Sequence, residues 1–302
     1  MKFREITKKT AIDFIGLRNK AFILSVVLVG LGLTGFVMVS LGKANLSVDF
    51  TGGTSVQTRF DQPVAIGALR NALTTGGIPD AEIEQVTGKN DFFIKTKLLE
   101  SPGTERVQDK IGAIIHQAFP DKKFQVLESN MVGSSVGKTL KRDAIVAIIL
   151  SLLGIVIYIA WRFNFIFGIA ATIATFHDVL ALLGIFYLLR FEMNILFITA
   201  LLTIAGYSLT DTVVVYDRIR DNMAKMKSRS DLGDVINKSI NEVLSRTLIT
   251  SLTVLLVLAA LLVIGGPVLF DFALALFIGV MVGTYSSIFV ASPLIYLWKK
   301  KT

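Results

Sequence analysis

The stretch at residues 193–216, MNILFITALLTIAGYSLTDTVVVY, indicates the fold class of this chain. It is apolar for most of its length, and as a helix rising about 1.5 Å per residue it is long enough to cross a bilayer core of about 30 Å. It also contains one carboxylate, Asp211, which is costly to place among apolar neighbours. The stretch therefore predicts a membrane helix that carries a functional residue.

Five further runs of the same kind, at residues 21–41, 143–161, 165–188, 247–264 and 272–298, give a polytopic α-helical membrane protein with six transmembrane helices. Only 18% of the 302 residues are charged and 53% are hydrophobic, which excludes an ordinary soluble enzyme. The absence of cysteine excludes disulfides, thiol nucleophiles and iron–sulfur clusters, and two histidines leave little for a metal site. We therefore expect no metal and no cofactor.

Residues 42–142, between the first two runs, have the composition of a water-soluble domain. Alternation over residues 45–60, with a turn at 51–53, predicts a β-hairpin. Helices are expected at 64–75 and 104–119, and strands at 82–86, 91–97 and 123–128. The order ββαββαβ predicts a small α+β domain.

The basic residues indicate topology. Seventeen lie in residues 1–20, at Arg162, in the expected loop at 217–246 and in the tail at 299–302, whereas the short opposite loops carry only Arg190. By the positive-inside rule both termini are cytoplasmic and the domain at 42–142 is extracytoplasmic. The net charge of +8 is thus explained without nucleic acid.

Small residues recur in three patterns. Gly30, Gly32 and Gly35 form a G-x-G-x-x-G inside an apolar span, where close helix packing is expected rather than dinucleotide binding. Residues 132–139, VGSSVGKT, are one residue short of a phosphate loop and predict a flexible joint. A third pattern repeats every four residues and predicts a packing face toward this chain or another subunit; it consists of Ala275, Gly279, Gly283 and Ser287.

Polar residues around Asp211 predict a buried stripe. Ser208 shares its helix face, and Arg246 opens the fifth span at a similar depth, with Thr250 and Thr253 expected to continue the arginine's face inward. Burial disfavours the charged carboxylate and a guanidinium favours it, so a small rearrangement would load or unload a proton. A proton carrier and a fixed ion pair remain equal alternatives for Asp211.

A second carboxylate, Asp178, lies deep in the third span beside His177. Helical geometry predicts that the two side chains point about 100° apart, which disfavours a metal site. A structural role is favoured for Asp178. An intramembrane aspartyl protease using Asp178 and Asp211 is disfavoured because the two would lie at different depths.

Seven ordered segments together resemble the SecD/SecF family of bacterial protein-export membrane proteins, which is related to the resistance-nodulation-division transporters. They are residues 48–53 (VDFTGG), 132–137 (VGSSVG), 177–179 (HDV), 206–211 (GYSLTD), 217–222 (DRIRDN), 245–251 (SRTLITS) and 265–268 (GGPV). The match extends over essentially the whole chain.

The resemblance implies the SecF-like half of a twelve-span transporter in the bacterial inner membrane, with SecD as the other half. Such a complex is not an enzyme. It uses the proton gradient to assist the SecY-SecE-SecG channel, with SecA and YajC, in moving an unfolded polypeptide from the outer side. Asp211 falls on the family's proton-linked aspartate and Arg246 on its partner arginine; Ser208 and Asp178 complete the candidate proton-coupling set.

The resemblance also implies structural roles for its signature residues. They are Asp49, Gly52, Gly53, Gly133, Gly137, Asp217 and Arg218. The family often has proline where this chain has Ser134, which bears on the stiffness of that joint. Two alternatives stay open: a small-solute or lipid exporter of the wider class, which predicts a second large external loop where this chain has only residues 265–271, and a purely scaffolding subunit.

Overall fold

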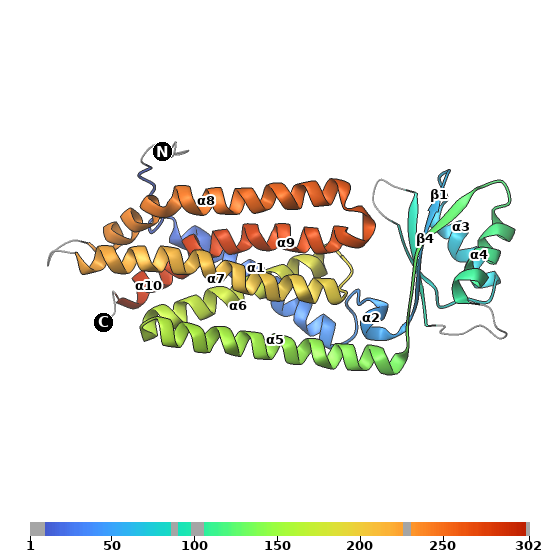
Figure 1. The fold of residues 1–302 in the computed structure, drawn as a ribbon, viewed down its shortest axis with the longest axis horizontal. Helices are drawn as coiled ribbons and strands as arrows, with labels where there is room; N and C mark the ends of the chain where they lie inside the picture. Colours follow the sequence, from blue (N-terminus) through green and yellow to red (C-terminus); the bar gives the residue numbers. More distant parts are fainter. Residues whose placement is uncertain (1–9, 86–89, 98–105, 226–230, 300–302) are drawn as a thin grey trace. The chain divides into compact units, whose positions relative to one another are not determined.

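The computed structural model describes residues 10–85, 90–97, 106–225 and 231–299 (Figure 1). The chain divides into two compact units: residues 1–45 with 146–302, and residues 46–145. Of the expected terminal segments 1–20 and 299–302, the described part is 10–20 and Lys299. The two units are described separately below.

Six long helices are apolar enough to cross a membrane, as predicted. They are α1 (Arg18–Ser40), α5 (Ser134–Arg162), α6 (Phe165–Leu188), α7 (Ile195–Ala224), α8 (Leu232–Ile264), and α9 (Gly266–Ser286) continuing through one π-helical turn (Ser287–Ala291) into α10 (Ser292–Lys299). Half or more of the apolar windows of α6, α7 and the α9–α10 helix are buried, compared with less than a fifth in α1, α5 and α8. Helices α6, α7 and α9–α10 therefore form the inner layer of the bundle.

The ends of several helices differ from the predicted ones. The expected flexible joint at 132–139 is wrong, because α5 begins at Ser134 instead of residue 143. The expected loop at 217–246 is also mostly helical, since α7 continues to Ala224 and α8 begins at Leu232. Asp231 caps α8 by accepting a hydrogen bond from the Gly233 amide at 3.0 Å.

Glycines allow α1 and α6 to cross closely. A Cβ atom added at Gly32 would lie 2.3 Å from the Leu180 carbonyl oxygen, and one added at Gly184 would lie 2.5 Å from the Gly32 nitrogen. Gly35 is nearly as tight, with Tyr187 Cβ at 3.2 Å, whereas Gly30 meets open space. The predicted packing role is confirmed for Gly32 and Gly35.

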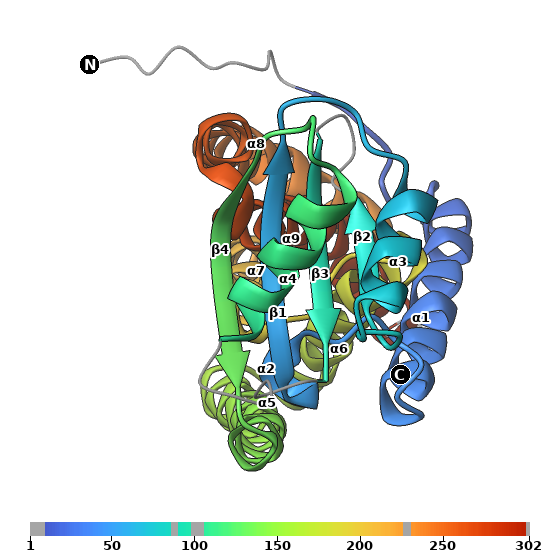
Figure 2. The same cartoon turned by 90° about the vertical axis from the view of Figure 1, so that its right-hand side faces the viewer.

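The smaller unit contains four antiparallel strands in the order β2-β3-β1-β4. They are β1 (Gly53–Phe60), β2 (Glu82–Gln85), β3 (Asp91–Thr96) and β4 (Phe124–Val132). Helices α3 (Ile66–Thr75) and α4 (Val107–Ala118) cover one face (Figure 2). Val56, Phe92 and Ile94 pack there with Leu69 and Ile111. The α+β class is confirmed.

The predicted hairpin at residues 45–60 is wrong. Residues Val48–Thr51 form a short helix, α2, because Ser47 caps it by accepting a hydrogen bond from the Asp49 amide at 3.2 Å. Only one strand, β1, follows, so the strands and larger helices run βαββαβ. Two details of the prediction, Val86 in the strand expected at 82–86 and residues 104–105 of the helix expected at 104–119, lie outside the described residues.

A candidate polar site inside the helix bundle

The site is built on one face of α7. Ser208, Asp211 and Thr212 are three and four residues apart, so helical geometry places them together. All three are buried, with Asp211 the most accessible at 7%. Thr212 bonds across to Ser287 beyond the end of α9, with 2.8 Å between their hydroxyl oxygens. The face therefore points into the bundle, as expected.

Asp178 of α6 lies at the meeting point of three helices and is fully buried. Its Oδ2 accepts hydrogen bonds from the hydroxyls of Ser208 of α7 and Ser286 of α9, the latter at 2.8 Å. Its Oδ1 lies 2.9 Å from Nδ1 of His177. These charge-assisted contacts join α6, α7 and α9 through one side chain.

The predicted separation of His177 and Asp178 is wrong. Helical spacing sets the direction of the Cα–Cβ bond, but the imidazole turns back toward its neighbour and reaches the carboxylate. The serine contacts could not be foreseen because Ser286 is distant from Asp178 in the sequence.

Asp211 has fewer partners than Asp178. Among the described residues its carboxylate accepts one hydrogen bond, from the Ser251 hydroxyl of α8 at 3.5 Å. That hydroxyl oxygen also lies 2.7 Å from Thr284 Oγ1 of α9. The carboxylate is thus buried but loosely held, which leaves room for it to change its protonation state or its partner.

Arg246 lies on α8 and is exposed. It is close enough to act on Asp211 electrostatically, although no ion pair joins these two described residues. Asp211 and Arg246 therefore form neither a tight ion pair nor two charges too far apart to interact.

The prediction that Thr250 and Thr253 lie on the inward face of α8 is wrong. Thr250 and Thr253 are exposed and donate hydrogen bonds to carbonyls of their own helix. In this part of α8 the buried polar residues are instead Thr247 and Ser251, which are four residues apart. That spacing was visible in the sequence, but its direction relative to Asp211 depends on the rotation of α8 within the bundle.

The small-residue stripe of α9 packs against α7. A Cβ at Gly279 would lie 2.4 Å from Ile204, and one at Gly283 would lie 2.9 Å from the Ser208 Cβ. Ala275 is also buried, and Ser287 bonds to Thr212 as described. Of the two alternatives, the stripe contacts this chain's own helix and brings α9 close to the polar face.

The signature glycines of the smaller unit occupy a tight turn. Gly52 and Gly53 have φ of +73° and +127°, and a Cβ at Gly53 would meet the Thr96 carbonyl oxygen at 2.3 Å. A Cβ at Gly137 would lie 3.0 Å from the Gly52 nitrogen, so the start of α5 approaches this turn. Asp49 lies in α2, and Gly133 meets open space between β4 and α5.

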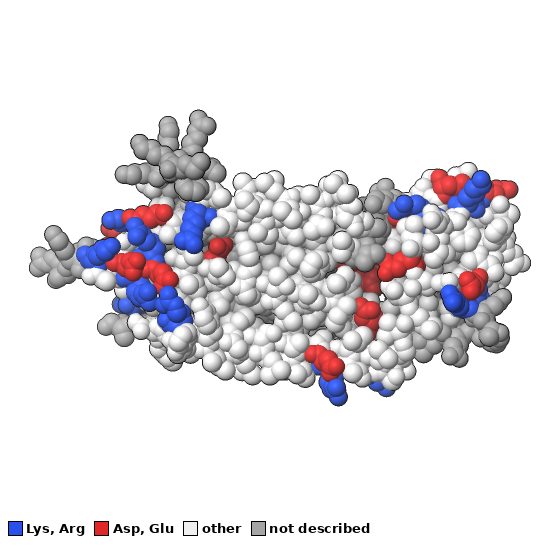
Figure 3. Space-filling view, viewed as in Figure 1, with Lys and Arg blue, Asp and Glu red and all other residues white. Residues whose placement is uncertain are grey.

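Asp217 and Arg218 belong to ion pairs at one end of the bundle, where charged side chains gather (Figure 3). Asp217 lies 3.1 Å from both Arg162 and Arg220, and Arg218 lies 2.6 Å from Glu242. These contacts connect the ends of α5, α7 and α8.

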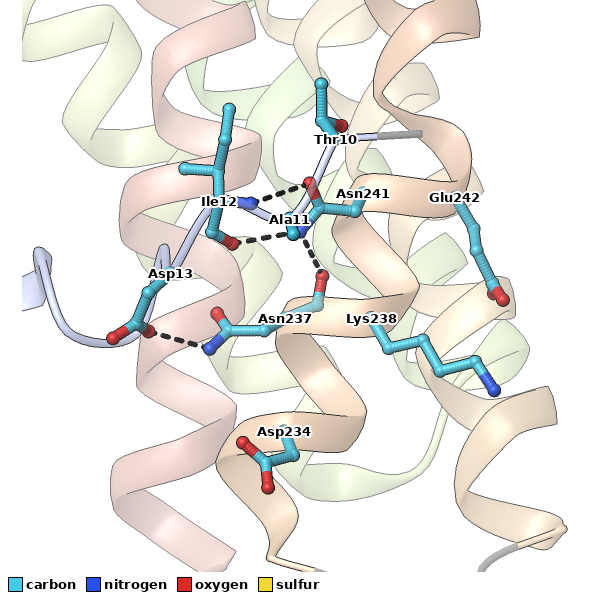
Figure 4. Close-up of a pocket in the computed structure, with 9 residues that line it drawn as sticks. All are labelled: Thr10, Ala11, Ile12, Asp13, Asp234, Asn237, Lys238, Asn241 and Glu242. Carbon is cyan, nitrogen blue, oxygen red and sulfur yellow. Dashed lines mark hydrogen bonds between the residues drawn. The ribbon is translucent and has the colours of Figure 1, made fainter. Parts of the chain in front are cut away.

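A clamp on the N-terminal segment was missed from the sequence. Asn241 of α8 accepts a hydrogen bond from the Ile12 amide at 3.1 Å and donates one to the Ile12 carbonyl at 2.9 Å, and Asn237 donates one to the Asp13 carboxylate (Figure 4). Asn237 also accepts a hydrogen bond from the Ile15 amide at 2.9 Å. The clamp borders a cavity of about 680 Å³. The i, i+4 spacing of the asparagines would have placed both on one face if the segment had been taken as helical, but their partner in the N-terminal segment is set only by the fold.

The described residues contain no group of three or more histidine, cysteine or acidic side chains that could hold a metal ion. The inner helices thus surround a polar centre built from carboxylates, hydroxyls and one imidazole. A multi-pass membrane protein with such a centre, and with a small α+β unit between its first two long helices, is the class that the geometry defines.

Comparison with known proteins gives the family. The model for "Protein export membrane protein SecD/SecF, C-terminal" matches residues 112–301, and that for the "SecD/SecF GG Motif" matches residues 43–64. Protein translocase subunit SecF of Thermodesulfovibrio yellowstonii is 50% identical over 299 residues, which cover 99% of this chain and 98% of that protein. The chain belongs to the SecD/SecF family of protein-export membrane proteins.

Two solved structures are similar in fold. The crystal structure of SecDF from Thermus thermophilus, titled a translocon-associated membrane protein, aligns with a TM-score of 0.84 and 37% identity, covering 99% of this chain and 40% of that one. SecDF in a super-membrane-facing form aligns with a TM-score of 0.66 and 36% identity, covering 97% and 39%. The family and the six apolar helices establish a multi-pass inner-membrane protein, and the small-solute exporter is not favoured.

Proposed function

We propose that the chain is the SecF-type half of a complex with SecD that assists the Sec translocon in protein export. A relative named protein translocase subunit SecDF, from Thermus thermophilus, is 42% identical over 264 residues, which cover 85% of this chain and 35% of that protein. Fusion of the two halves in that relative supports SecD as the partner. On this proposal the chain moves protein and catalyses no reaction.

The observation that carries the proposal is the environment of Asp211. Its carboxylate is buried in a membrane helix yet accepts a single long hydrogen bond among the described residues. A buried group with weak partners changes charge when its surroundings shift slightly. One proton crossing the membrane potential contributes about 2.3 kcal/mol per 100 mV, which is available for work on a translocating chain.

The remaining members of the coupling set act around this carboxylate. Arg246 supplies the positive charge that competes with the proton. Ser208, one helical turn from Asp211, ties the same face of α7 to Asp178 on α6. A change of charge at Asp211 would therefore alter forces on α7, which contacts both α6 and α9.

The topology follows from the basic residues. Both termini and the end of the bundle that contains Asp217 face the cytoplasm, and the domain at 42–142 faces outward, where it meets the unfolded polypeptide. The SecY-SecE-SecG channel, SecA and YajC are the further partners on this proposal.

The test is a late-export assay with and without a proton gradient, using Asp211→Asn and Arg246→Lys in the complex with SecD. Asp221→Asn is the matched control, because Asp221 is an exposed carboxylate farther along the same helix. We expect Asp211→Asn to reduce export to the level seen without a gradient and Asp221→Asn to retain the full response.

The Asp211→Asn variant must lose the gradient response while still assembling with SecD, and co-purification checks this assembly. If Asp211→Asn assembles normally and keeps its full dependence on the gradient, Asp211 is not the carrier. The chain would then act as a scaffold, the alternative that tolerates loss of this charge.

A further inference from the structure

His177 is a buried titratable group that the proposed mechanism does not use. Its side chain is 3% exposed and lies on α6 within the bundle. Nδ1 lies 2.9 Å from Asp178 Oδ1, whereas Nε2 has no hydrogen-bond partner among the described residues. A buried imidazole nitrogen without a partner requires an explanation, because such groups are usually satisfied.

With Asp178 ionised, its contacts favour hydrogen on Nδ1 of His177. The hydroxyls of Ser208 and Ser286 donate hydrogen bonds to Oδ2, because an ionised carboxylate only accepts them. Oδ1 is then the acceptor for Nδ1–H of His177. The Nε2 lone pair then has no donor among the described residues and is open to a proton.

The groups around the imidazole come from several helices. On α9, the Tyr285 ring is centred 6.1 Å from the His177 ring, and its hydroxyl bonds Ser25 of α1 and donates to the Ala21 carbonyl. The ionisable residues of the helices packed around α6 are Tyr207, Asp211, Tyr216, Asp217, Arg218, Arg220 and Asp221 on α7, Asp271 and Tyr285 on α9, Tyr296 and Lys299 on α10, and Arg18 and Lys20 on α1. Of these, Tyr285 contacts the His177 ring, Asp211 lies three residues from Ser208 on the buried face of α7, and Tyr216 is fully buried farther along α7.

We propose that His177 is a second proton-binding group of the bundle and that Asp178, Ser208 and Ser286 hold it in the accepting tautomer. This inference rests on the proposed proton coupling at Asp211. Binding forms one N–H bond at Nε2, breaks one O–H bond of a hydronium ion and leaves a water molecule. The pair changes from a neutral imidazole with a carboxylate, net charge −1, to an imidazolium with a carboxylate, net charge zero.

The change of charge acts on three helices at once. Ser208 and Ser286 donate hydrogen bonds to the Asp178 carboxylate, whose neighbouring imidazole gains a positive charge when the proton binds. The strength of these two bonds, which tie α7 and α9 to α6, therefore changes with the proton. Ser286 is the last residue of α9 before the π-helical turn Ser287–Ala291. Such turns break the regular hydrogen-bond register and are frequent at functional sites, which gives α9 a place to adjust.

The first test is spectroscopic and uses the unmodified protein in its complex with SecD in lipid. The chain has two histidines, and His116 on α4 is exposed and serves as the internal reference. Nitrogen-15 NMR of labelled histidine, recorded between about pH 5 and pH 9, should show a His177 spectrum that changes with pH, with His177 in the Nδ1–H tautomer when neutral. Asp178→Asn should shift the neutral His177 toward the Nε2–H tautomer.

The second test is the gradient-dependent export assay with His177→Asn, which keeps a donor toward Asp178 but removes the Nε2 acceptor. We expect loss of the gradient-dependent component, and full retention in the matched control His116→Asn.

A His177 spectrum that does not change with pH would overturn the inference, as would full gradient dependence in an assembled His177→Asn variant. Either result leaves the proposed function intact, provided that Asp211→Asn still abolishes the gradient response. If Asp211→Asn has no effect, the proposed function fails independently of the His177 spectrum.

Discussion

At the scale of single residues, the two buried carboxylates differ in how completely they are satisfied. Asp178 has one hydrogen-bond partner on Oδ1 and two on Oδ2. Asp211 has one long hydrogen bond among the described residues. Hydrogen bonds to a charged group typically contribute about 1.5–3 kcal/mol each, so the Asp178 side chain is held in place far more firmly. On the proposed function, this contrast fits proton exchange at Asp211 and positioning by Asp178.

Sequence reasoning found both carboxylates because charge in an apolar run is a local signal. It could not find their partners, since Ser251 and Ser286 lie on helices that meet them only after folding. The direction of the His177 ring depends on a side-chain torsion that residue spacing does not specify.

A pH prediction concerns Asp13, which lies before α1. The Gly16 amide and, secondarily, the Asn237 amide donate to its carboxylate and hold the pKa of Asp13 below its ordinary value. Because the folded pKa is lowered, this contribution is fully present above the ordinary value of about 3.9 and is lost as the pH falls through the folded pKa. Hydrogen exchange of residues 10–17 should therefore be protected near neutral pH and lose protection in acid.

Asp13→Asn is the control, because its side chain cannot titrate. Its exchange, corrected for the intrinsic pH effect, should lack the acid transition. An identical acid transition in this variant would assign the loss of protection to another group.

At the scale of elements, the helices were predictable and their contacts were not. Hydropathy located six membrane helices because each apolar run is continuous in sequence. The ends of α5, α7 and α8 were missed because polar residues continue these helices beyond the apolar runs. The hairpin prediction failed because Ser47 caps α2, a local hydrogen bond that competes with strand pairing.

The crossing of α1 and α6 gives a stability prediction. Gly32→Ala would place a methyl group 2.3 Å from a backbone oxygen, which the helices can relieve only by separating. We expect the free energy of unfolding to fall by about 1–3 kcal/mol, the usual effect of overpacking. Gly30→Ala in the same helix meets open space and should be neutral or stabilising, by at most about 1 kcal/mol.

Thermal unfolding of the two variants in one detergent compares them directly. Equal stability of the Gly32→Ala and Gly30→Ala proteins would show that the helices do not cross at this glycine.

At the scale of the whole molecule, the order of short motifs was enough to indicate the family. Each motif alone is a weak match, but several weak matches in the same order along the chain are specific together. The positive-inside count gave a topology but no test of it. Labelling can supply one, since the chain has no cysteine and single-cysteine variants carry no background.

Asp121→Cys, exposed in the smaller unit, should react with a membrane-impermeant maleimide in cells whose outer barrier has been opened. Asp221→Cys, exposed near the end of α7, should react only after the inner membrane is permeabilised. The reverse pattern would invert the proposed topology and place the smaller unit in the cytoplasm.

The central claim is that the Asp211 carboxyl group binds and releases a proton inside the bundle. The most direct measurement is the pH-difference infrared spectrum of the complex with SecD in lipid, in which a protonated carboxyl group gives its own carbonyl band. We expect a band that grows as the pH is lowered, persists in Asp221→Asn and is absent in Asp211→Asn. An unchanged set of carboxyl bands in a correctly assembled Asp211→Asn protein would contradict the account.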